Sequence, residues 1–281
     1  MEEKQNFPRA TGFSGKILIA SLFILSGILL FARNMGWITS EVFDLIVSWH
    51  SLLILLGIYA MIRRHFIGGI ILFLAAYISS KSREMRQWKK MVIPFLFAIP
   101  IIVIVGIENL STCIILLAIS FIMIFVATPL LVPFVVIGLI GVAGAGGLLL
   151  TQGYRMERIT VWLDPAASEK GHQTIQGLYA IGSGGLFGKG LGQSMQKLGF
   201  LPEANNDMIF SVICEELGLF GAVCVILLFL LMIWRFMIIV NNASDLYGAL
   251  VVVGIMAHLS IQVILNIAVV TNTIPNTGIT L

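Results

Sequence analysis

The residues best suited to chemistry lie in one polar, glycine-rich stretch, residues 151–207, which interrupts a series of long apolar segments. In so apolar a chain, a long irregular segment is the expected place for a functional site. Asp207 closes the stretch and is followed at once by the apolar run from Met208 to Trp234. A carboxylate within reach of a hydroxyl group can take its proton as a general base. Judged from its neighbours alone, Asp207 fits an interfacial residue or a helix N-cap better.

A glycine run, GSGGLFGKGLG from Gly182 to Gly192, lies inside the same stretch. Its backbone N–H groups could approach a phosphate, as they do in anion-binding nests. Alternatively, the glycines permit positive φ angles in a loop that folds back on itself. Composition alone favours this second interpretation. Arg155 and Arg158 similarly suit plain anchors at the membrane surface.

Two adjacent carboxylates, Glu215 and Glu216, fall inside the apolar run that follows Asp207. Carrying a carboxylate into the apolar zone of a membrane costs about 2.5–3.5 kcal/mol on insertion scales, so both need polar partners. If one straight helix starts at Asp207, Glu216 lies roughly 13 Å further along it and about 180° around. We therefore expect Glu216 to pack or hydrogen-bond between helices and not to act as a second catalytic carboxylate.

The composition defines the elements that must position these residues. With 58% hydrophobic residues, 11% charged residues and a mean hydropathy of +1.01, the chain cannot be a water-soluble domain. Since lipid excludes irregular backbone, we predict an all-α, polytopic membrane helix bundle of about seven to eight helices with one long extracytoplasmic loop. The net charge of +3 is small and dispersed, which gives no support for nucleic-acid binding. The cysteines show no metal-ligand spacing, so no metal site is predicted.

Apolar segments of membrane length predict the spans and their direction. The candidates are Ile17 to Ala32, Leu45 to Ile62, Phe66 to Ser80, Met91 to Ile107, Thr112 to Ala127, Leu130 to Leu150, Ile209 to Trp234 and Leu246 to Val270. The connector from Lys81 to Lys90 holds five basic residues against one acidic residue, which places it in the cytoplasm. Counting spans from this connector puts residues 151–207 on the external face and Asp207 at the outer membrane surface.

The first part of the chain has a different character. Arg63, Arg64 and His65 would be external if Phe66 to Ser80 crossed the membrane, which conflicts with the positive-inside rule. That segment is also short, about 22 Å as a helix, so a re-entrant or peripheral placement is an alternative. Its apolar runs and RNMG turn give residues 1–75 a resemblance to the hydrophobic hairpin of LiaF-type membrane proteins.

From Leu74 onward, several motifs follow one another in a characteristic order. They are Arg155 and Arg158, LDP at 163–165, GHQ at 171–173, the glycine run, LPEANND at 201–207 and EELG at 215–218. In this order and spacing they resemble the SEDS family of shape, elongation, division and sporulation proteins, which includes FtsW and RodA. Gln262, Asn266 and the PNTG of 275–278 fit the family's penultimate helix and the turn after it. Residues 76–281 are thus expected to form a partial SEDS core, with LPEANND and EELG nearest to the FtsW branch.

The resemblance implies a peptidoglycan glycosyltransferase that polymerises lipid II at the outer face of the bacterial cytoplasmic membrane. Asp207 matches the family's essential carboxylate and would take the proton of the attacking hydroxyl group. Because pyrophosphate leaves readily, one carboxylate suffices where glycosidases use two. The expected partners are a class B penicillin-binding protein and other divisome proteins, with no nucleic acid.

The resemblance also assigns the remaining site residues. Substrate binding is expected from Arg155, Arg158, Gln173, Lys189, Lys197 and Glu203, with Arg158 and Lys189 favoured for the pyrophosphate. Glu215, Glu216 and Asn266 are expected to be structural residues within the membrane. A divalent cation could share the charge, although no ligand spacing demands one.

The chain also departs from the family pattern. His172, Asn205, Met208 and Thr280 replace residues that are common in the family. The sequence stops at Leu281, where the family continues into a PF-[IV]-SYGGSS motif, and the first helices are replaced by the hairpin-like region. We therefore expect weak or no turnover and keep two alternatives, a catalytically inactive fragment or interaction protein and a lipid II transporter. The transporter fits less well because polarity is concentrated in one loop and not in broken helices at mid-membrane.

Overall fold

The computed structural model describes most of the chain after residue 48. The described residues are 31, 34–36, 49–62, 65–82, 87–128, 132–150, 153–168, 171–198, 201, 204 and 206–276. The chain divides into two compact units, Met1–Leu52 and Leu53–Leu281, and nearly all described residues belong to the second. Apart from Phe31, the predicted span Ile17 to Ala32 lies outside them.

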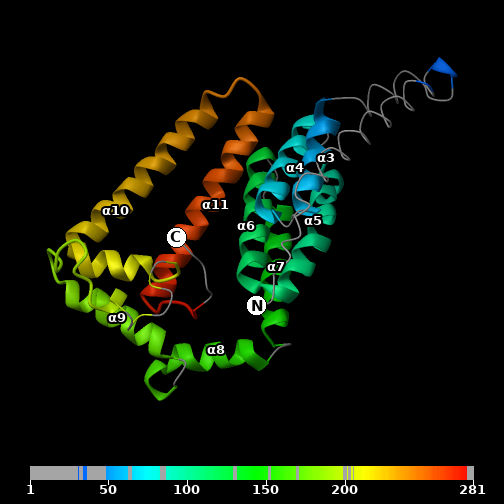
Figure 1. The fold of residues 1–281 in the computed structure, drawn as a ribbon. Helices are drawn as coiled ribbons and strands as arrows, with labels where there is room; N and C mark the ends of the chain where they lie inside the picture. The colour runs from blue at the N-terminus through cyan, green and yellow to red at the C-terminus, as the bar shows by residue number, and fades with distance from the viewer. Residues whose placement is uncertain are drawn as a thin grey trace, which may run out of the picture. The chain divides into compact units, whose positions relative to one another are not determined.

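The described part is built from helices, which confirms the predicted all-α membrane fold (Figure 1). The helices are α3 (Trp49–Ile62), α4 (Phe66–Ser80), α5 (Trp88–Glu108), α6 (Leu110–Ala127), α7 (Val132–Leu150), α8 (Gly153–Leu163), α9 (His172–Gly184), α10 (Ile209–Asn241) and α11 (Leu246–Val270). Two short 3₁₀ turns, η2 (Pro165–Ala167) and η4 (Gln196–Leu198), lie between them. Within the described ranges, α5, α6, α10 and α11 are the four helices long and apolar enough to cross a membrane.

Hydropathy predicted the bounds of two helices correctly, because polar residues flank both apolar runs. The predicted segments Phe66 to Ser80 and Leu246 to Val270 match α4 and α11. Asp245 caps α11, since its carboxylate accepts a hydrogen bond from the backbone N–H of Gly248 at 2.8 Å. Asn109 caps α6 in the same way, by accepting from Thr112.

Helix α4 lies at the centre of the packed bundle, against α6 and α11. Leu74 and Ile78 on α4 are fully buried, together with Leu116 and Met123 on α6. The close contacts of these buried side chains stabilise the short helix through dispersion. The segment is short, but it packs within the helix bundle, and its placement relative to the membrane stays a prediction.

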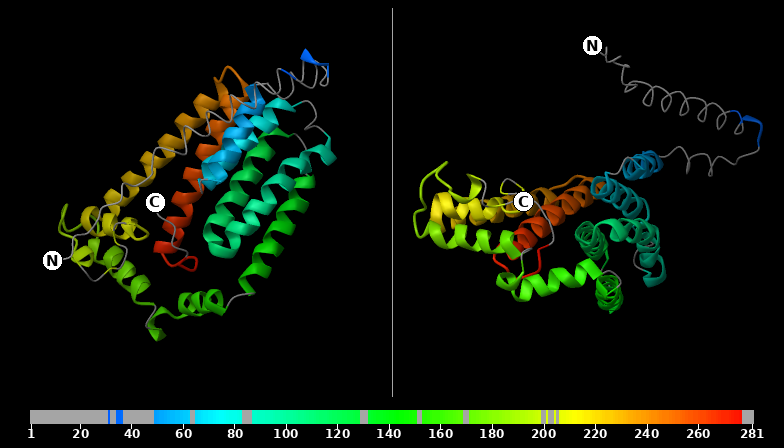
Figure 2. Two further views of the ribbon diagram at one scale, coloured as in Figure 1. Left: turned by 45° about the vertical axis from the view of Figure 1, so that its right-hand side comes forward. Right: turned by 60° about the horizontal axis from the view of Figure 1, so that its bottom comes forward.

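The polar stretch 151–207 is more regular than its composition indicated. It contains α8 and α9, which gather with the first segment of α10 at the end of the bundle where α7 and the last turn of α11 lie (Figure 2). Helix α8 is amphipathic, which gives a polar sequence an apolar face to pack. The interpretation of the stretch as one irregular loop is therefore wrong, because two helices within it form a framework.

Candidate functional site

Asp207 lies immediately before α10, and α11 fixes its backbone. The side-chain amide of Asn266, a fully buried residue of α11, donates a hydrogen bond to the carbonyl oxygen of Asp207 at 2.9 Å. Met208 is also buried and packs in a small apolar cluster with Val270 of α11 and with Leu201. Asp207 is thus a partly buried residue held where the start of α10 meets α11.

The first segment of α10 is held closely against α9. A β-carbon at Gly184, the last residue of α9, would overlap the carbonyl group of Cys214. At Gly177, about two turns earlier, an added β-carbon would lie 3.2 Å from the Oγ atom of Ser211. The two glycines therefore let the backbones approach, so α9 supports the segment that begins beside Asp207.

Helix α10 is broken at Gly218, which has a φ of 68° and a ψ of −168°. This combination of positive φ and extended ψ favours glycine because residues with a β-carbon are strained there. The carbonyl groups of Glu215 and Glu216, which would otherwise bond forward along the helix, accept from the loop instead. Lys189 N donates to Glu215 O at 2.9 Å, and Gly190 N donates to Glu216 O at 3.0 Å.

The break also leaves two N–H groups after Gly218 without their usual helical partners, and carbonyl groups of the loop accept hydrogen bonds from them. Leu219 N donates to the carbonyl oxygen of Gly185 at 2.9 Å, and Phe220 N donates to that of Leu186 at 3.1 Å. The loop and the broken helix thus exchange four backbone hydrogen bonds, so the break leaves these groups satisfied. Figure 1 shows the consequence: the yellow first segment of α10 turns sharply into the long orange segment.

This exchange decides between the two interpretations of the glycine run. Gly185, Gly188, Gly190 and Gly192 all have positive φ angles, as a folded-back loop requires. The N–H groups of Gly188, Lys189 and Gly190 donate to carbonyl groups of the protein. A phosphate-binding nest made of these N–H groups is therefore not present.

Glu215 is fully buried and accepts hydrogen bonds from several groups between the end of α9 and η4. Lys189 Nζ lies 2.7 Å from Glu215 Oε1, and the hydroxyl group of Ser194, also buried, donates to Glu215 Oε2. Ser183 Oγ and Gln196 N complete the set at 3.4 Å each. A charge removed from water needs such pairing and hydrogen bonding, and this carboxylate has both.

Glu216 is paired in the same way, but closer to the surface. Lys197 Nζ lies 3.0 Å from Glu216 Oε1, and Lys197 is exposed. The role predicted for Lys189 and Lys197 toward a pyrophosphate stays a prediction, and each lysine already has a carboxylate partner in the protein. Both carboxylates also lie before the break at Gly218, so neither follows the straight membrane helix assumed from the sequence.

A second polar group joins α8 and α9 to the turn that follows α11. Arg158 Nη1 donates to the backbone oxygen of Asn276 at 3.2 Å, and Asn276 Nδ2 donates to Gln173 Oε1 at 3.0 Å. Nearby, Trp162 Nε1 donates to the carbonyl oxygen of Asn272 at 2.9 Å. The structure thus brings the predicted residues Arg158 and Gln173 together through Asn276.

Several functional candidates were not identified as site residues from the sequence. Asn276 belongs to the PNTG motif, which the sequence indicates only as a turn, and the role of Ser194 depends on the folded loop that brings it to Glu215. Among the predicted residues, Glu203 and the side chain of Arg155 lie outside the described part. In that part, no group of three or more His, Cys, Asp or Glu side chains is close enough to hold a metal ion.

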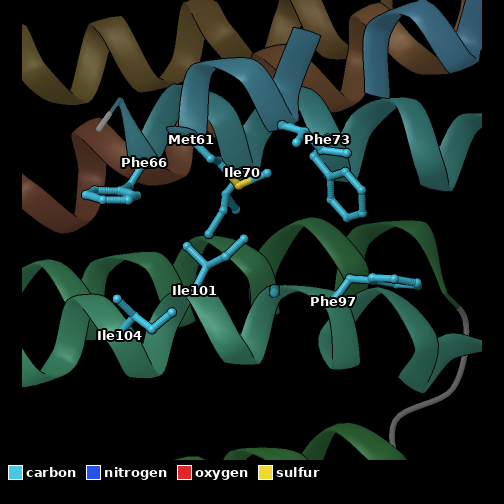
Figure 3. Close-up of a pocket in the computed structure, with 9 residues that line it drawn as sticks. Met61, Phe66, Ile70, Phe73, Phe97, Ile101 and Ile104 are labelled. Atoms are coloured by element: carbon cyan, nitrogen blue, oxygen red, sulfur yellow. The ribbon is translucent and has the colours of Figure 1, made fainter. Parts of the chain in front are cut away.

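A cavity of about 300 Å³ lies away from these polar groups, between α3, α4 and α5 (Figure 3). Its lining is apolar and includes Met61, Phe66, Ile70, Phe97 and Ile101. With no polar side chain in its wall, it cannot recognise a charged head group.

Comparison with known proteins assigns these features to a family. The family model for cell cycle proteins of the FtsW/RodA/SpoVE type matches residues 66–281, and the model for the LiaF transmembrane domain matches residues 18–112. The two matches overlap over residues 66–112, so the boundary expected near residue 75 stays a prediction. The resemblances drawn from the sequence motifs are both confirmed.

Individual relatives agree with the family match. Stage V sporulation protein E of Bacillus subtilis (strain 168) is 44% identical over 219 residues, which cover 76% of this chain and 59% of that protein. The probable peptidoglycan glycosyltransferase FtsW of Geobacter sp. (strain M18) is 33% identical over 217 residues, with the same two shares. The chain therefore spans about three-fifths of the length of these curated relatives.

A solved structure has a similar fold. It is described by the words "Structural coordination of polymerization and crosslinking by a peptidoglycan synthase complex", and it matches with a TM-score of 0.59. The match covers 76% of this chain and 60% of the other chain at 24% sequence identity, so the likeness concerns the fold alone.

Proposed function

Because the chain belongs to the FtsW/RodA/SpoVE family of cell cycle proteins, we propose that it is a peptidoglycan glycosyltransferase whose substrate is lipid II. Several relatives are named probable peptidoglycan glycosyltransferases, which supports the reaction class. The chain is a multi-pass membrane protein, and we place it in the bacterial cytoplasmic membrane with residues 151–207 on the outer face.

The observation that carries the proposal is the placement of Asp207. Its carboxylate stands at the start of α10, half-buried, with its backbone held by Asn266. In the proposed reaction, a sugar hydroxyl group of one substrate attacks the anomeric carbon of another. Asp207 takes the hydroxyl proton as the new C–O bond forms and the bond to the pyrophosphate oxygen breaks. The electron pair leaves with the pyrophosphate, which needs no acid because it is a good leaving group.

Arg158 is the preferred cation for the pyrophosphate. Its guanidinium group is exposed and lies beside Asn276 and Gln173, and a guanidinium can contact phosphate oxygens in a bidentate manner. Lys189 and Lys197 are less suitable because binding a phosphate would compete with their pairing to Glu215 and Glu216. Gln173 and Asn276 could orient the guanidinium or contact the sugar.

A class B penicillin-binding protein is the proposed partner, because a transpeptidase would cross-link the strands made here. The similarity to a peptidoglycan synthase complex that joins polymerisation to crosslinking supports this pairing. Other divisome proteins are proposed on the same basis.

The test is reconstitution of the purified chain in lipid vesicles with lipid II, with glycan strands measured by gel electrophoresis. We expect slow strand synthesis that is lost in Asp207→Asn. The matched control is Asp245→Asn, which lies in the α10–α11 turn and whose amide retains the helix cap. Lipid II translocation that persists in Asp207→Asn would support a transporter instead. No product from either chain, in an assay where a full-length relative is active, would support an inactive fragment.

A further inference from the structure

The loop that bonds to the break in α10 exposes an unusual amount of apolar surface. We call residues 185–192 the glycine loop. Its large apolar side chains are almost uncovered: Leu186 is 64% exposed, Phe187 82% and Leu191 77%. Three exposed apolar side chains on one short loop are unfavourable in water. Exposed apolar surface of this kind marks contact with a membrane or with another protein.

The apolar surface of the glycine loop continues onto the long segment of α10. The bond from Phe220 N to Leu186 O sets the loop beside the first turn after the break, and Figure 1 shows the yellow-green loop next to that end of the helix. Leu219 and Phe220 are exposed there, and further along the helix so are Leu228 and Trp234. The segment Leu219–Asn241 is about 34 Å long as a helix, enough to cross the apolar core of a bilayer. We therefore expect its exposed face to contact lipid, and the loop extends that face.

Part of the backbone of the glycine loop meets the condition that lipid imposes. Irregular backbone is tolerated at membrane depth only where its polar groups are bonded within the protein. Gly188 N bonds to Gly184 O at 2.8 Å, and Lys189 N and Gly190 N bond to the carbonyl groups at the break. The carbonyl groups of Gly185 and Leu186 accept from α10, and that of Gly190 accepts from Gln193 N. Six backbone groups of the glycine loop, three N–H groups and three carbonyl groups, are thus bonded within the protein.

The charge of the glycine loop is neutralised as well. Lys189 is its single ionisable residue, and its ammonium group turns inward to the buried Glu215 at 2.7 Å. An unpaired ammonium group at this place would make insertion of the loop into lipid unfavourable, because a charge is costly to move out of water. Pairing it with a carboxylate of α10 leaves Phe187 and Leu191 as the outward groups on either side.

From these observations we propose that the glycine loop is inserted in the lipid bilayer beside the first turn of Leu219–Asn241, with Phe187 and Leu191 among the acyl chains. The occupant of this apolar surface is lipid and not a partner protein, because the surface is continuous with the exposed apolar face of a helix long enough to cross a membrane. Insertion would anchor the first segment of α10 at the membrane surface. The proposal does not depend on the proposed function.

The test places an environment-sensitive NBD fluorophore on the loop of the full chain in phosphatidylcholine and phosphatidylglycerol vesicles. Cys113, Cys214 and Cys224 are replaced by alanine, and a single cysteine is introduced as Phe187→Cys. Leu228→Cys, on the exposed face of α10, is the lipid control. Ser244→Cys, in the exposed α10–α11 turn, is the water control. These two controls also show whether the cysteine-free chain is folded and inserted.

We expect the label at position 187 to show blue-shifted emission. A lipid nitroxide placed near the head of the acyl chain should quench most of its fluorescence intensity. A nitroxide near the terminal methyl group should quench it less than it quenches the label at position 228, and aqueous iodide should have no effect. Leu191→Cys should repeat this pattern. Strong quenching by iodide at both loop positions would overturn the proposal. Emission that is shielded from both iodide and lipid nitroxides would also overturn it, because protein would then cover the loop.

Discussion

At the residue scale, the structure separates cations that pair with carboxylates of the protein, Lys189 and Lys197, from Arg158, which donates to a backbone oxygen. Lys189 and Lys197 neutralise Glu215 and Glu216, so much of the charge that sequence motifs offered to a substrate is used within the protein. The sequence could indicate that buried carboxylates need partners. It could not show which cations these were, because the pairing joins residues 19 and 26 positions apart through a loop whose path was unknown.

The two lysine–glutamate pairs provide a matched comparison. Lys189→Met leaves the carboxylate of Glu215 buried without its cation, and we expect a loss of about 1–3 kcal/mol in the free energy of unfolding. Lys197→Met removes a cation from a pair closer to the surface and should cost about 0–1 kcal/mol. Thermal unfolding of both variants in detergent measures the difference. Equal losses would contradict a structural role for the Lys189–Glu215 pair.

At the element scale, the apolar runs predicted the helices, and the interactions between elements determined the rest. Hydropathy placed the start of α10 at Ile209, but it could not predict the break at Gly218, because a single glycine in an apolar run is compatible with an unbroken helix. The break becomes favourable only when the glycine loop supplies the missing backbone partners. Helices α8 and α9 were missed for a related reason: their apolar faces are short, and tertiary packing stabilises them.

The break at Gly218 should be sensitive to substitution. In Gly218→Ala, the positive φ alone costs about 1–2 kcal/mol, and the added β-carbon would meet backbone atoms of Gly188 and Leu186. The control is Gly146→Ala in α7, where an added β-carbon meets nothing within 4 Å. That substitution should be neutral or stabilise the helix by up to about 1 kcal/mol. The two melting temperatures in detergent should therefore move in opposite directions or differ clearly, and a stable Gly218→Ala variant would argue against the break.

At the scale of the whole molecule, the chain carries matches to two family models, which overlap over residues 66–112. The composition was sufficient to predict an all-α membrane protein, and the ordered motifs were sufficient to predict its family. The orientation of the bundle rests on the basic connector between α4 and α5 and stays a prediction. The positions of Asn276 and Ser194 could not be predicted, because each belongs to a contact between segments far apart in the chain.

The orientation can be tested with cysteine-free chains expressed in bacterial cells. Ser82→Cys, in the connector after α4, should react with a membrane-impermeant maleimide only after the cells are opened. Ala166→Cys, in the exposed turn η2, should react in intact cells. The reverse pattern would place Asp207 on the cytoplasmic side and exclude strand synthesis at the outer face.

The most direct measurement for the central claim separates binding from chemistry at Asp207. Lipid II binding and strand synthesis are measured in the same vesicles for the original chain, Asp207→Asn and Asp207→Glu. A general base makes its contribution in the transition state, so Asp207→Asn should retain lipid II affinity while strand synthesis falls by about 10²–10⁴-fold, and Asp207→Glu should recover part of the rate. Undiminished strand synthesis by Asp207→Asn would contradict the assignment of this carboxylate as the base.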